Sequence, residues 1–321
     1  MKTIEQLRIE VEQEIIGLKY PSHPSDLYAP IDYILGIGGK RMRPILLLLA
    51  HQLYNKDFSQ ALMPSVAIEV FHNFTLLHDD IMDKAPLRRG NDTVHEKWNN
   101  NVAILSGDAM LIQSYQYFYD LDAKVLKEVL SVFNQAALQV CEGQQYDMDF
   151  EIQAEVSMDS YLKMIEYKTA ILLAASLKIG AIIGGAPTKE TDLLYSFGRD
   201  IGIAFQLKDD LLDAFGDQKI FGKRVGGDII SNKKTCLYLQ ALERSDKSTK
   251  MELVNLYSSS NVDVLTKVER VKEIYTHLNI PAVTNELIDK YYNKAMESLS
   301  LIGGDKTELV RFAEMLKSRE N

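Results

Sequence analysis

Cysteine is scarce in this sequence. Cys141 and Cys236 are the only two among 321 residues, and neither belongs to a Cys-x-x-Cys pair. This pattern excludes a disulfide framework and a cysteine-based zinc site, and it is typical of a protein of the reducing cytosol. Linkers are scarce too, because no stretch rich in proline and serine divides the chain. We therefore expect one domain that spans residues 1–321.

The sequence also has few long apolar runs and fewer basic than acidic side chains. The N-terminus carries acidic and amide side chains where an export signal would be apolar, so we expect a cytoplasmic protein. The most apolar window, 170–186, contains Ser176, Lys178 and three glycines. Because it is shorter than the roughly 20 residues that span a bilayer, it predicts a buried core helix and no membrane span. The 45 acidic and 36 basic side chains give a formal net charge of -9, which argues against nucleic acid or an anionic membrane as a partner.

Apolar residues recur at helical spacing along nearly the whole chain. Near the N-terminus they lie three or four residues apart, and no stretch alternates convincingly in the manner of a strand. Similar stripes run through 65–83, 101–119, 124–149, 160–183, 190–215, 262–278 and 284–299. The breaks between them are short and rich in turn residues, so the pattern predicts an all-α fold of about a dozen helices.

One short acidic motif occurs twice in the sequence. Asp79-Asp80-Ile81-Met82-Asp83 and Asp209-Asp210-Leu211-Leu212-Asp213 are both DDxxD, and each follows an apolar helical run. Residues four apart share a helix face, so the first and last aspartates of each motif are aligned. One such cluster is typical of a solvated helix face. Two copies at the ends of apolar helices favour a bound hard cation, Mg²⁺ or Ca²⁺, which takes oxygen ligands.

Basic side chains flank these motifs. Lys40, Arg41 and Arg43 precede an apolar segment, Arg88-Arg89-Gly90 follows the first acid motif, and Lys223-Arg224 follows the second. The first group is no P-loop, but a helix that begins near Pro44 offers free N–H groups to an anion. Arginine matches phosphate oxygens with its fork of donors. Each pair alone is typical of a solvated turn, whereas their position beside the acid motifs favours an anionic ligand bridged by metal.

The ordered set of motifs resembles the trans-isoprenyl diphosphate synthases. It runs from Gly-Gly-Lys-Arg-x-Arg-Pro through the first DDxxD, Arg88-Arg89-Gly90 and Lys168-Thr169 to Phe205-Gln206-Leu207-Lys208 and the second DDxxD, over about residues 5 to 320. The resemblance implies an isoprenoid synthase bundle of antiparallel helices around a central cavity, with the acid motifs facing across its mouth, and a homodimer. It also implies Mg²⁺-dependent condensation of isopentenyl diphosphate, head-to-tail, with dimethylallyl, geranyl or farnesyl diphosphate.

The resemblance assigns roles to individual residues. About three Mg²⁺ ions would be ligated by carboxylates of both motifs, directly by Asp79, Asp83 and Asp209 and in support by Asp80, Asp210 and Asp213. The allylic diphosphate would be bound by Arg88, Lys168, Lys223 and Lys233. Isopentenyl diphosphate would be bound by Lys40, Arg43, His72 and Arg89. Oxygens near the developing carbocation would come from Thr169 and Gln206, which with Lys168 and Arg88 serve catalysis.

Three of these assignments carry additional arguments. His72 lies seven residues before Asp79 near the same helix face, although a histidine on an apolar helix is more often a core residue. Lys168 stands among apolar neighbours, where an unpaired ammonium is costly, so a functional role is favoured. The segment 218–232 matches a flexible flap, whose closure would bring Lys223 and Lys233 to the diphosphate and exclude water.

Product length is expected to depend on the helix before the first acid motif. Thr75 lies one turn below Asp79, and Phe74 lies slightly further along. An aromatic residue at the Phe74 position resembles the cavity floor of short-chain enzymes. It favours geranylgeranyl diphosphate (C20), then farnesyl diphosphate (C15), then long-chain products. The alternative is that Phe74 is ordinary core packing.

Three other functions stay open at this point. A class I terpene cyclase would share the helical bundle and the first DDxxD, but it usually has a different second metal motif. A non-catalytic partner subunit of a prenyl synthase tends to lose the acid motifs, which are intact here. A metal-dependent phosphohydrolase would release phosphate without joining carbons.

Overall fold

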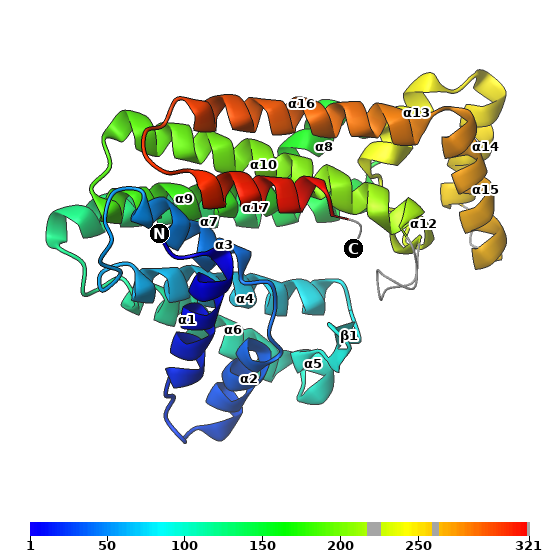
Figure 1. Cartoon of the computed structure of the whole chain (residues 1–321). Helices are drawn as coiled ribbons and strands as arrows, with labels where there is room; N and C mark the ends of the chain where they lie inside the picture. Colours follow the sequence, from blue (N-terminus) through cyan, green and yellow to red (C-terminus); the bar gives the residue numbers. More distant parts are fainter. Residues whose placement is uncertain (217–225, 259–262, 320–321) are drawn as a thin grey trace. The chain divides into compact units, whose positions relative to one another are not determined.

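The chain is almost entirely helical. The computed structural model describes residues 1–216, 226–258 and 263–319 (Figure 1). Within these ranges the only strands are β1 (Leu87–Arg88) and β2 (Asn91–Asp92), which form one antiparallel hairpin. The predicted all-α fold is therefore confirmed.

The helices begin and end at the following residues: α1 Ile4–Gly17, α2 Ser25–Gly36, α3 Met42–Gln52, α4 Leu62–Met82, α5 Val94–Lys97, α6 Asn100–Gln116, α7 Ala123–Ile152, α8 Met158–Ile165, α9 Ile171–Gly184, α10 Thr188–Phe215, α12 Gly227–Ile230, α13 Cys236–Arg244, α14 Lys247–Ser258, α15 Val264–His277, α16 Ile280–Ser300 and α17 Thr307–Lys317. The predicted stripes coincide with α4, α6, α7, α10, α15 and α16 to within a few residues. The stripe at 160–183 differs, because a π-helical turn, η1 (Glu166–Ala170), separates α8 from α9.

The chain forms two compact units, each built from several segments. The first unit comprises Met1–Asn134, Ala175–Tyr195 and Gly303–Leu309. The second comprises Gln135–Ala174, Ser196–Ile302 and Val310–Asn321. Each unit contains one DDxxD motif. The expectation of a single domain stays a prediction.

In the first unit, close helix contacts fix the position of α4. The segment of α3 from Pro44 to Gln52 is buried throughout, which explains its apolar sequence. Gly180 of α9 packs so tightly on α3 that a Cβ there would lie 1.9 Å from the Leu47 carbonyl oxygen. Gly107 of α6 faces the ring of His78 on α4, where a Cβ would lie 2.3 Å from Nε2. A side chain at Gly180 would collide with the α3 backbone, and one at Gly107 would displace the His78 ring, so α6 packs closely on α4, which carries the first acid motif.

In the second unit, two glycines hold the π-helical turn. A Cβ at Gly143 of α7 would lie 2.3 Å from the backbone nitrogen of Lys168. A Cβ at Gly202 of α10 would lie 2.6 Å from the Cα of Ala170. The turn that carries Lys168 and Thr169 is thus in close contact with both α7 and α10. Interruptions of this kind are frequent at functional sites.

One helical stretch is long and apolar enough to cross a membrane by composition. It runs from Met158 to Gly184, and 61% of its most apolar window is buried inside the structure. Leu173 and Leu177 in the window 170–186 are fully buried, which fits the core helix that the sequence predicts. The expected absence of a membrane span stays a prediction.

Candidate active site

The first acid motif lies at the C-terminal end of α4 in the first unit. The backbone amide of Asp83, the residue that follows the helix, donates to the Asp79 carbonyl oxygen at 2.9 Å. The last turn is therefore complete, and the two side chains lie along one face, as the spacing predicts. Asp80 is only 3% exposed, whereas a fifth of the Asp79 side chain (20%) is exposed.

Arg88 makes a bidentate ion pair with the buried Asp80. Its Nε and Nη2 donate to Oδ2 and Oδ1, each at 2.7 Å, and Nη2 lies 3.6 Å from Oδ2 of Asp79. Burial raises the pKa of Asp80 above its usual value, although the hydrogen bonds from Arg88 oppose that rise. A residue predicted to bind diphosphate and a predicted metal-supporting residue are thus joined in this structure, and Arg88 holds its partner through the planar fork that also fits a phosphate.

Arg43, His72 and Arg89 form a cationic cluster beside this motif. Arg43 Nη1 lies 2.9 Å from His72 Nε2. A guanidinium has only donors, so His72 accepts and is neutral. Burial, followed by the charge of Arg43, lowers the pKa of His72 well below its ordinary value, and burial lowers the pKa of Arg43 to about 10. The backbone of Gly39 lies directly against the Arg89 guanidinium, and Lys40 is the next residue.

The cluster also contains an unsatisfied donor. Nε of Arg43 is buried, and no acceptor meets it within the described ranges of the chain. A buried donor of a charged group that lacks an acceptor is costly. Three of the four residues predicted to hold isopentenyl diphosphate, Arg43, His72 and Arg89, therefore lie together around a buried donor that lacks an acceptor.

Arg41, which the sequence groups with these cations, has a different role. Its guanidinium is buried and donates to Glu69 Oε1 at 2.8 Å, to Glu12 Oε1 at 3.0 Å and to the Leu35 carbonyl oxygen at 2.7 Å. Its backbone adopts a left-handed conformation with φ of 47° at the start of α3. Arg41 therefore ties α3 to neighbouring segments of the first unit, and the expectation that it joins the anion site is wrong.

Phe74 and Thr75 lie within α4 as predicted. Phe74 is buried, with ring centroids 4.8 Å from His78 and 5.6 Å from Phe71. The Thr75 hydroxyl donates to the His72 carbonyl oxygen at 2.8 Å. Edge-on and tilted ring contacts around Phe74 suit both a cavity floor and plain core packing, so the role in product length stays a prediction.

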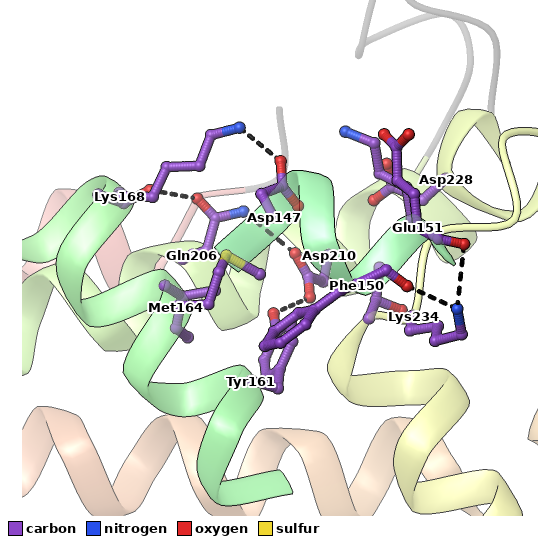
Figure 2. A pocket seen from close by; sticks show the side chains of 14 residues that line it. Asp147, Phe150, Glu151, Tyr161, Met164, Lys168, Gln206, Asp210, Asp228 and Lys234 are labelled. Atoms are coloured by element: carbon purple, nitrogen blue, oxygen red, sulfur yellow. Dashed lines mark hydrogen bonds and ion pairs between the residues drawn. The ribbon is translucent and has the colours of Figure 1, made fainter. Parts of the chain in front are cut away.

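The second unit contains a cavity of about 130 Å³ beside the second acid motif (Figure 2). Its lining includes five residues that the sequence predicts for the site: Lys168, Thr169, Gln206, Asp210 and Lys233. The predicted substrate-binding lysine Lys223 lies outside the described residues, as do residues 218–225 of the expected flap. The remainder of that segment forms the short helix α12 and the turn after it.

Four side chains form a continuous hydrogen-bonded chain along this cavity. The Thr169 hydroxyl donates to Gln206 Oε1 at 3.0 Å, and Gln206 Nε2 donates to Asp210 Oδ1 at 3.1 Å. The Tyr161 hydroxyl donates to the other oxygen of Asp210, Oδ2. Burial, followed by the charge of Asp228, raises the pKa of Asp210 to about 7, while these hydrogen bonds oppose the rise. Tyr161 belongs to no sequence motif and was missed by the sequence analysis.

Lys168 forms an ion pair, whereas its apolar sequence neighbours suggest an unpaired buried ammonium. Its Nζ lies 2.6 Å from Oδ2 of Asp147 on α7 (Figure 2). The carboxylate and the ammonium are each partly exposed to the cavity, so a diphosphate oxygen is able to share or replace this partner. No sequence signal distinguished Asp147 from the other acids of α7.

The other two aspartates of the second motif have partners within the same unit. Arg319 Nη1 lies 2.6 Å from Oδ1 of Asp209. Asp213 Oδ2 accepts the backbone amide of Asp228 at 2.9 Å, which anchors α12. Among the described residues, no group of three or more His, Cys, Asp or Glu side chains is arranged to hold a metal ion.

Comparison with known proteins finds relatives over the whole chain. A family model described as polyprenyl synthetase matches residues 24–278. The geranylgeranyl diphosphate synthase of Methanosarcina mazei is 35% identical over 315 residues, which cover 97% of this chain and 95% of that protein.

Solved structures show the same likeness. A geranylgeranyl pyrophosphate synthase superposes with a TM-score of 0.95 at 43% identity over 100% of both chains. The enzyme from Pyrococcus horikoshii superposes with a TM-score of 0.92 at 33% identity, over 99% of this chain and 97% of its own. These likenesses confirm that the fold is the all-α isoprenoid synthase bundle.

Proposed function

The chain belongs to the polyprenyl synthetase family of trans-isoprenyl diphosphate synthases, and we propose that it is a cytoplasmic short-chain prenyltransferase with geranylgeranyl diphosphate as main product. It condenses isopentenyl diphosphate head-to-tail with an allylic diphosphate of five to fifteen carbons. The observation that carries this proposal is the cation cluster of the half-buried Arg43 and His72 and the exposed Arg89, which contains a buried unsatisfied donor, Nε of Arg43, beside the first acid motif.

The cation cluster is suited to the diphosphate of isopentenyl diphosphate. Because Nε2 of His72 accepts from Arg43, the ring proton of the neutral imidazole is on Nδ1, where it is able to donate to a phosphate oxygen. Burial and, to a smaller extent, the charge of Arg89 lower the pKa of Arg43, while burial and the charges of Arg41 and Arg88 lower the pKa of Arg89. A bound anion would offset these like charges and supply an acceptor to Arg43 Nε.

The aspartate pairs fit Mg²⁺. They supply hard oxygen donors on a single helix face, and Asp79 and Asp209 keep part of their side chains exposed. We propose that Asp79, Asp83 and Asp209 hold about three ions, with Asp80, Asp210 and Asp213 in support. When bound, the ions stabilise the negative charge that develops on the departing diphosphate.

Lys168, Thr169 and Gln206 serve the allylic substrate in this proposal. Lys168 and Lys233 line the cavity of the second unit and would bind the allylic diphosphate, together with Arg88 and Lys223. The Thr169 hydroxyl donates its hydrogen bond to Gln206, so the lone pairs of its oxygen are available to a developing allylic cation. The released diphosphate takes the proton that the condensed product loses.

Exposed apolar side chains on α6 support a homodimer. Leu105 and Ile112 are 59% and 62% exposed and lie seven residues apart near one face of the helix, and the neighbouring Ile104 is 43% exposed. Large apolar side chains that gather at the surface mark an interaction site. Light scattering coupled to size-exclusion chromatography tests this assignment, and a monomer at micromolar concentration would refute it.

Product analysis tests the proposed function. The purified chain is incubated with Mg²⁺, labelled isopentenyl diphosphate and each of the C5, C10 and C15 allylic primers, and product lengths are measured. We expect incorporation of label with C20 as the dominant product. Diphosphate release without incorporation would indicate a terpene cyclase or phosphohydrolase. Elongation only with an added second protein would indicate a partner subunit, and a main product of C30 or longer would refute the assignment of Phe74.

A further inference from the structure

Tyr161 contributes the only hydroxyl among the donors that converge on Asp210 in the described part of the chain. The tyrosine is 2% exposed, and its hydroxyl donates to Asp210 Oδ2 (Figure 2). The backbone amide of Cys236 approaches the same oxygen at 3.4 Å, and Gln206 Nε2 donates to Oδ1 at 3.1 Å. Asp210 is thus held by groups from α8, α10 and α13, all in the second unit.

The direction of each hydrogen bond follows from the chemistry of the groups. In its ionised form Asp210 only accepts, so Gln206 presents its amide nitrogen to Asp210 and its amide oxygen to Thr169. That oxygen has no proton, so Thr169 must donate. A flipped Gln206 amide would place two oxygens together at Asp210 and would leave the Thr169 proton free to point toward the cavity.

We propose that Tyr161 is a positioning residue for prenyl transfer, which acts through Asp210 and Gln206 to make Thr169 present oxygen lone pairs to the allylic carbon. The inference rests on the proposed function. In that reaction the bond between the allylic carbon and the diphosphate oxygen breaks, and the diphosphate leaves with both electrons. Lone pairs directed at the resulting cation stabilise it, whereas a hydroxyl proton in the same direction would destabilise it.

The proposal also assigns Asp210 to positioning Gln206, in place of the supporting metal role that the resemblance implies for it. Its two oxygens are engaged by Tyr161 and Gln206, while the neighbouring Asp209 is more exposed. Asp210 therefore orients the amide next to it, and the hydroxyl of Tyr161 keeps the carboxylate in the orientation required.

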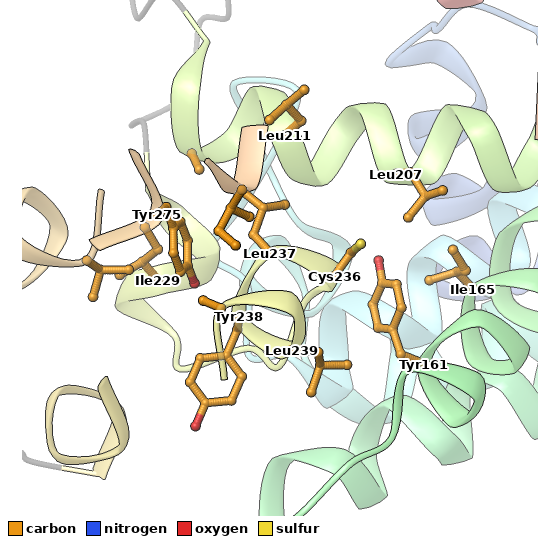
Figure 3. Packing of buried hydrophobic residues seen from close by; sticks show 14 of the residues in the cluster. Tyr161, Ile165, Leu207, Leu211, Ile229, Cys236, Leu237, Tyr238, Leu239 and Tyr275 are labelled. Atoms are coloured by element: carbon orange, nitrogen blue, oxygen red, sulfur yellow. The ribbon is translucent and has the colours of Figure 1, made fainter. Parts of the chain in front are cut away.

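Tyr161→Phe, with Tyr275→Phe as matched control, tests the proposal. Tyr161 and Tyr275 belong to the same buried cluster (Figure 3), and the Tyr275 hydroxyl lies 2.8 Å from the Tyr257 hydroxyl. Single-turnover rates are measured with saturating isopentenyl diphosphate, along with KM for both substrates and the Mg²⁺ concentration at half-maximal rate. We expect Tyr161→Phe to lower the rate about tenfold, with KM and the Mg²⁺ requirement unchanged. Tyr275→Phe should retain the wild-type rate.

A double-mutant cycle with Thr169→Val separates positioning from a general loss of packing. If Tyr161 acts through Thr169, its tenfold effect shrinks to less than about twofold once the threonine hydroxyl is absent. A full tenfold effect in the Thr169→Val background overturns the proposal. So does recovery of the Tyr161→Phe rate at high Mg²⁺, which would mark Asp210 as a metal ligand.

Melting temperatures identify a variant that fails to fold. In that case Asp210→Asn tests the same connection, because an asparagine no longer fixes the direction of the Gln206 amide. The same loss of rate and the same dependence on Thr169 are expected, and an additive effect overturns the proposal. A wild-type chain that forms no elongated product refutes the proposed function instead, which keeps the two failures distinguishable.

Discussion

Gly39 provides a sharp test of the assignment of Arg89 to isopentenyl diphosphate. In Gly39→Ala the added Cβ would lie 2.6 Å from Nη1 and 2.9 Å from Cζ and Nη2 of Arg89. Ordinary contacts begin near about 3.5 Å, so the guanidinium must move by roughly 1 Å. The moving atoms are the end of a flexible side chain, so the fold should survive while the position of the charge changes.

The expected effect is confined to one substrate. A hydrogen bond between charged groups contributes about 1.5–3 kcal/mol, so loss of the Arg89 contact should raise KM for isopentenyl diphosphate by about 10- to 100-fold. KM for the allylic substrate should stay unchanged, as should kcat at saturation, because the contact is made equally in the ground and transition states.

Gly38→Ala is the matched control for backbone strain. Gly38 has a positive φ of 81°, as Gly39 has one of 153°, but no atom lies within 4 Å of its added Cβ. Both alanines therefore strain the loop, by roughly 1–2 kcal/mol, and only one displaces Arg89. Steady-state kinetics with each substrate varied in turn provides the assay. Equal rises in KM for the two variants, or none for Gly39→Ala, would refute the assignment.

Four further outcomes are expected. Arg319→Ala should lower the Mg²⁺ concentration for half-maximal rate about fivefold, because the guanidinium and the metal compete for the same oxygen of Asp209. Asp79→Ala should reduce turnover by orders of magnitude while circular dichroism shows an unchanged helix content. Phe74→Ala should lengthen the product as measured by chromatography, whereas unchanged length with lowered melting temperature would mark a core residue. His72 has a folded pKa below its unfolded value, so stability should fall as pH drops through about 6.5 toward that lower pKa, and His72→Gln should show a shallower fall in melting temperature between pH 7 and 5.

Helices and acid motifs were predictable because their signals are local. Periodicity over a dozen residues identified α4, α6, α7, α10, α15 and α16, and the four-residue spacing aligned Asp79 with Asp83. The π-helical turn was not predictable, because residues 160–183 are apolar on both sides of it. The close approaches of Gly143 and Gly202 that accompany the turn come from helices elsewhere in the second unit.

Partners of the site residues were not predictable, because they are distant in sequence. Tyr161 lies 49 residues from Asp210, and Arg319 lies 110 residues from Asp209. Arg41 shows the opposite error. It stands between Lys40 and Arg43, which are both predicted to bind isopentenyl diphosphate, yet its backbone is left-handed and its side chain pairs with Glu69 and Glu12. Neighbours in a basic run therefore need not serve the same site.

The π-helical turn affects the direction of the Lys168 and Thr169 side chains more than it affects the flanking helices. A π turn is an α-helix with one residue inserted, so deletion of one residue within Glu166–Ala170 would let α8 continue into α9 as regular helix. The flanking helices would keep their register, while side chains inside the turn would change direction by about 100°. A chain one residue shorter at this point would therefore keep its flanking helices but lose the contacts that Lys168 and Thr169 make with Asp147 and Gln206.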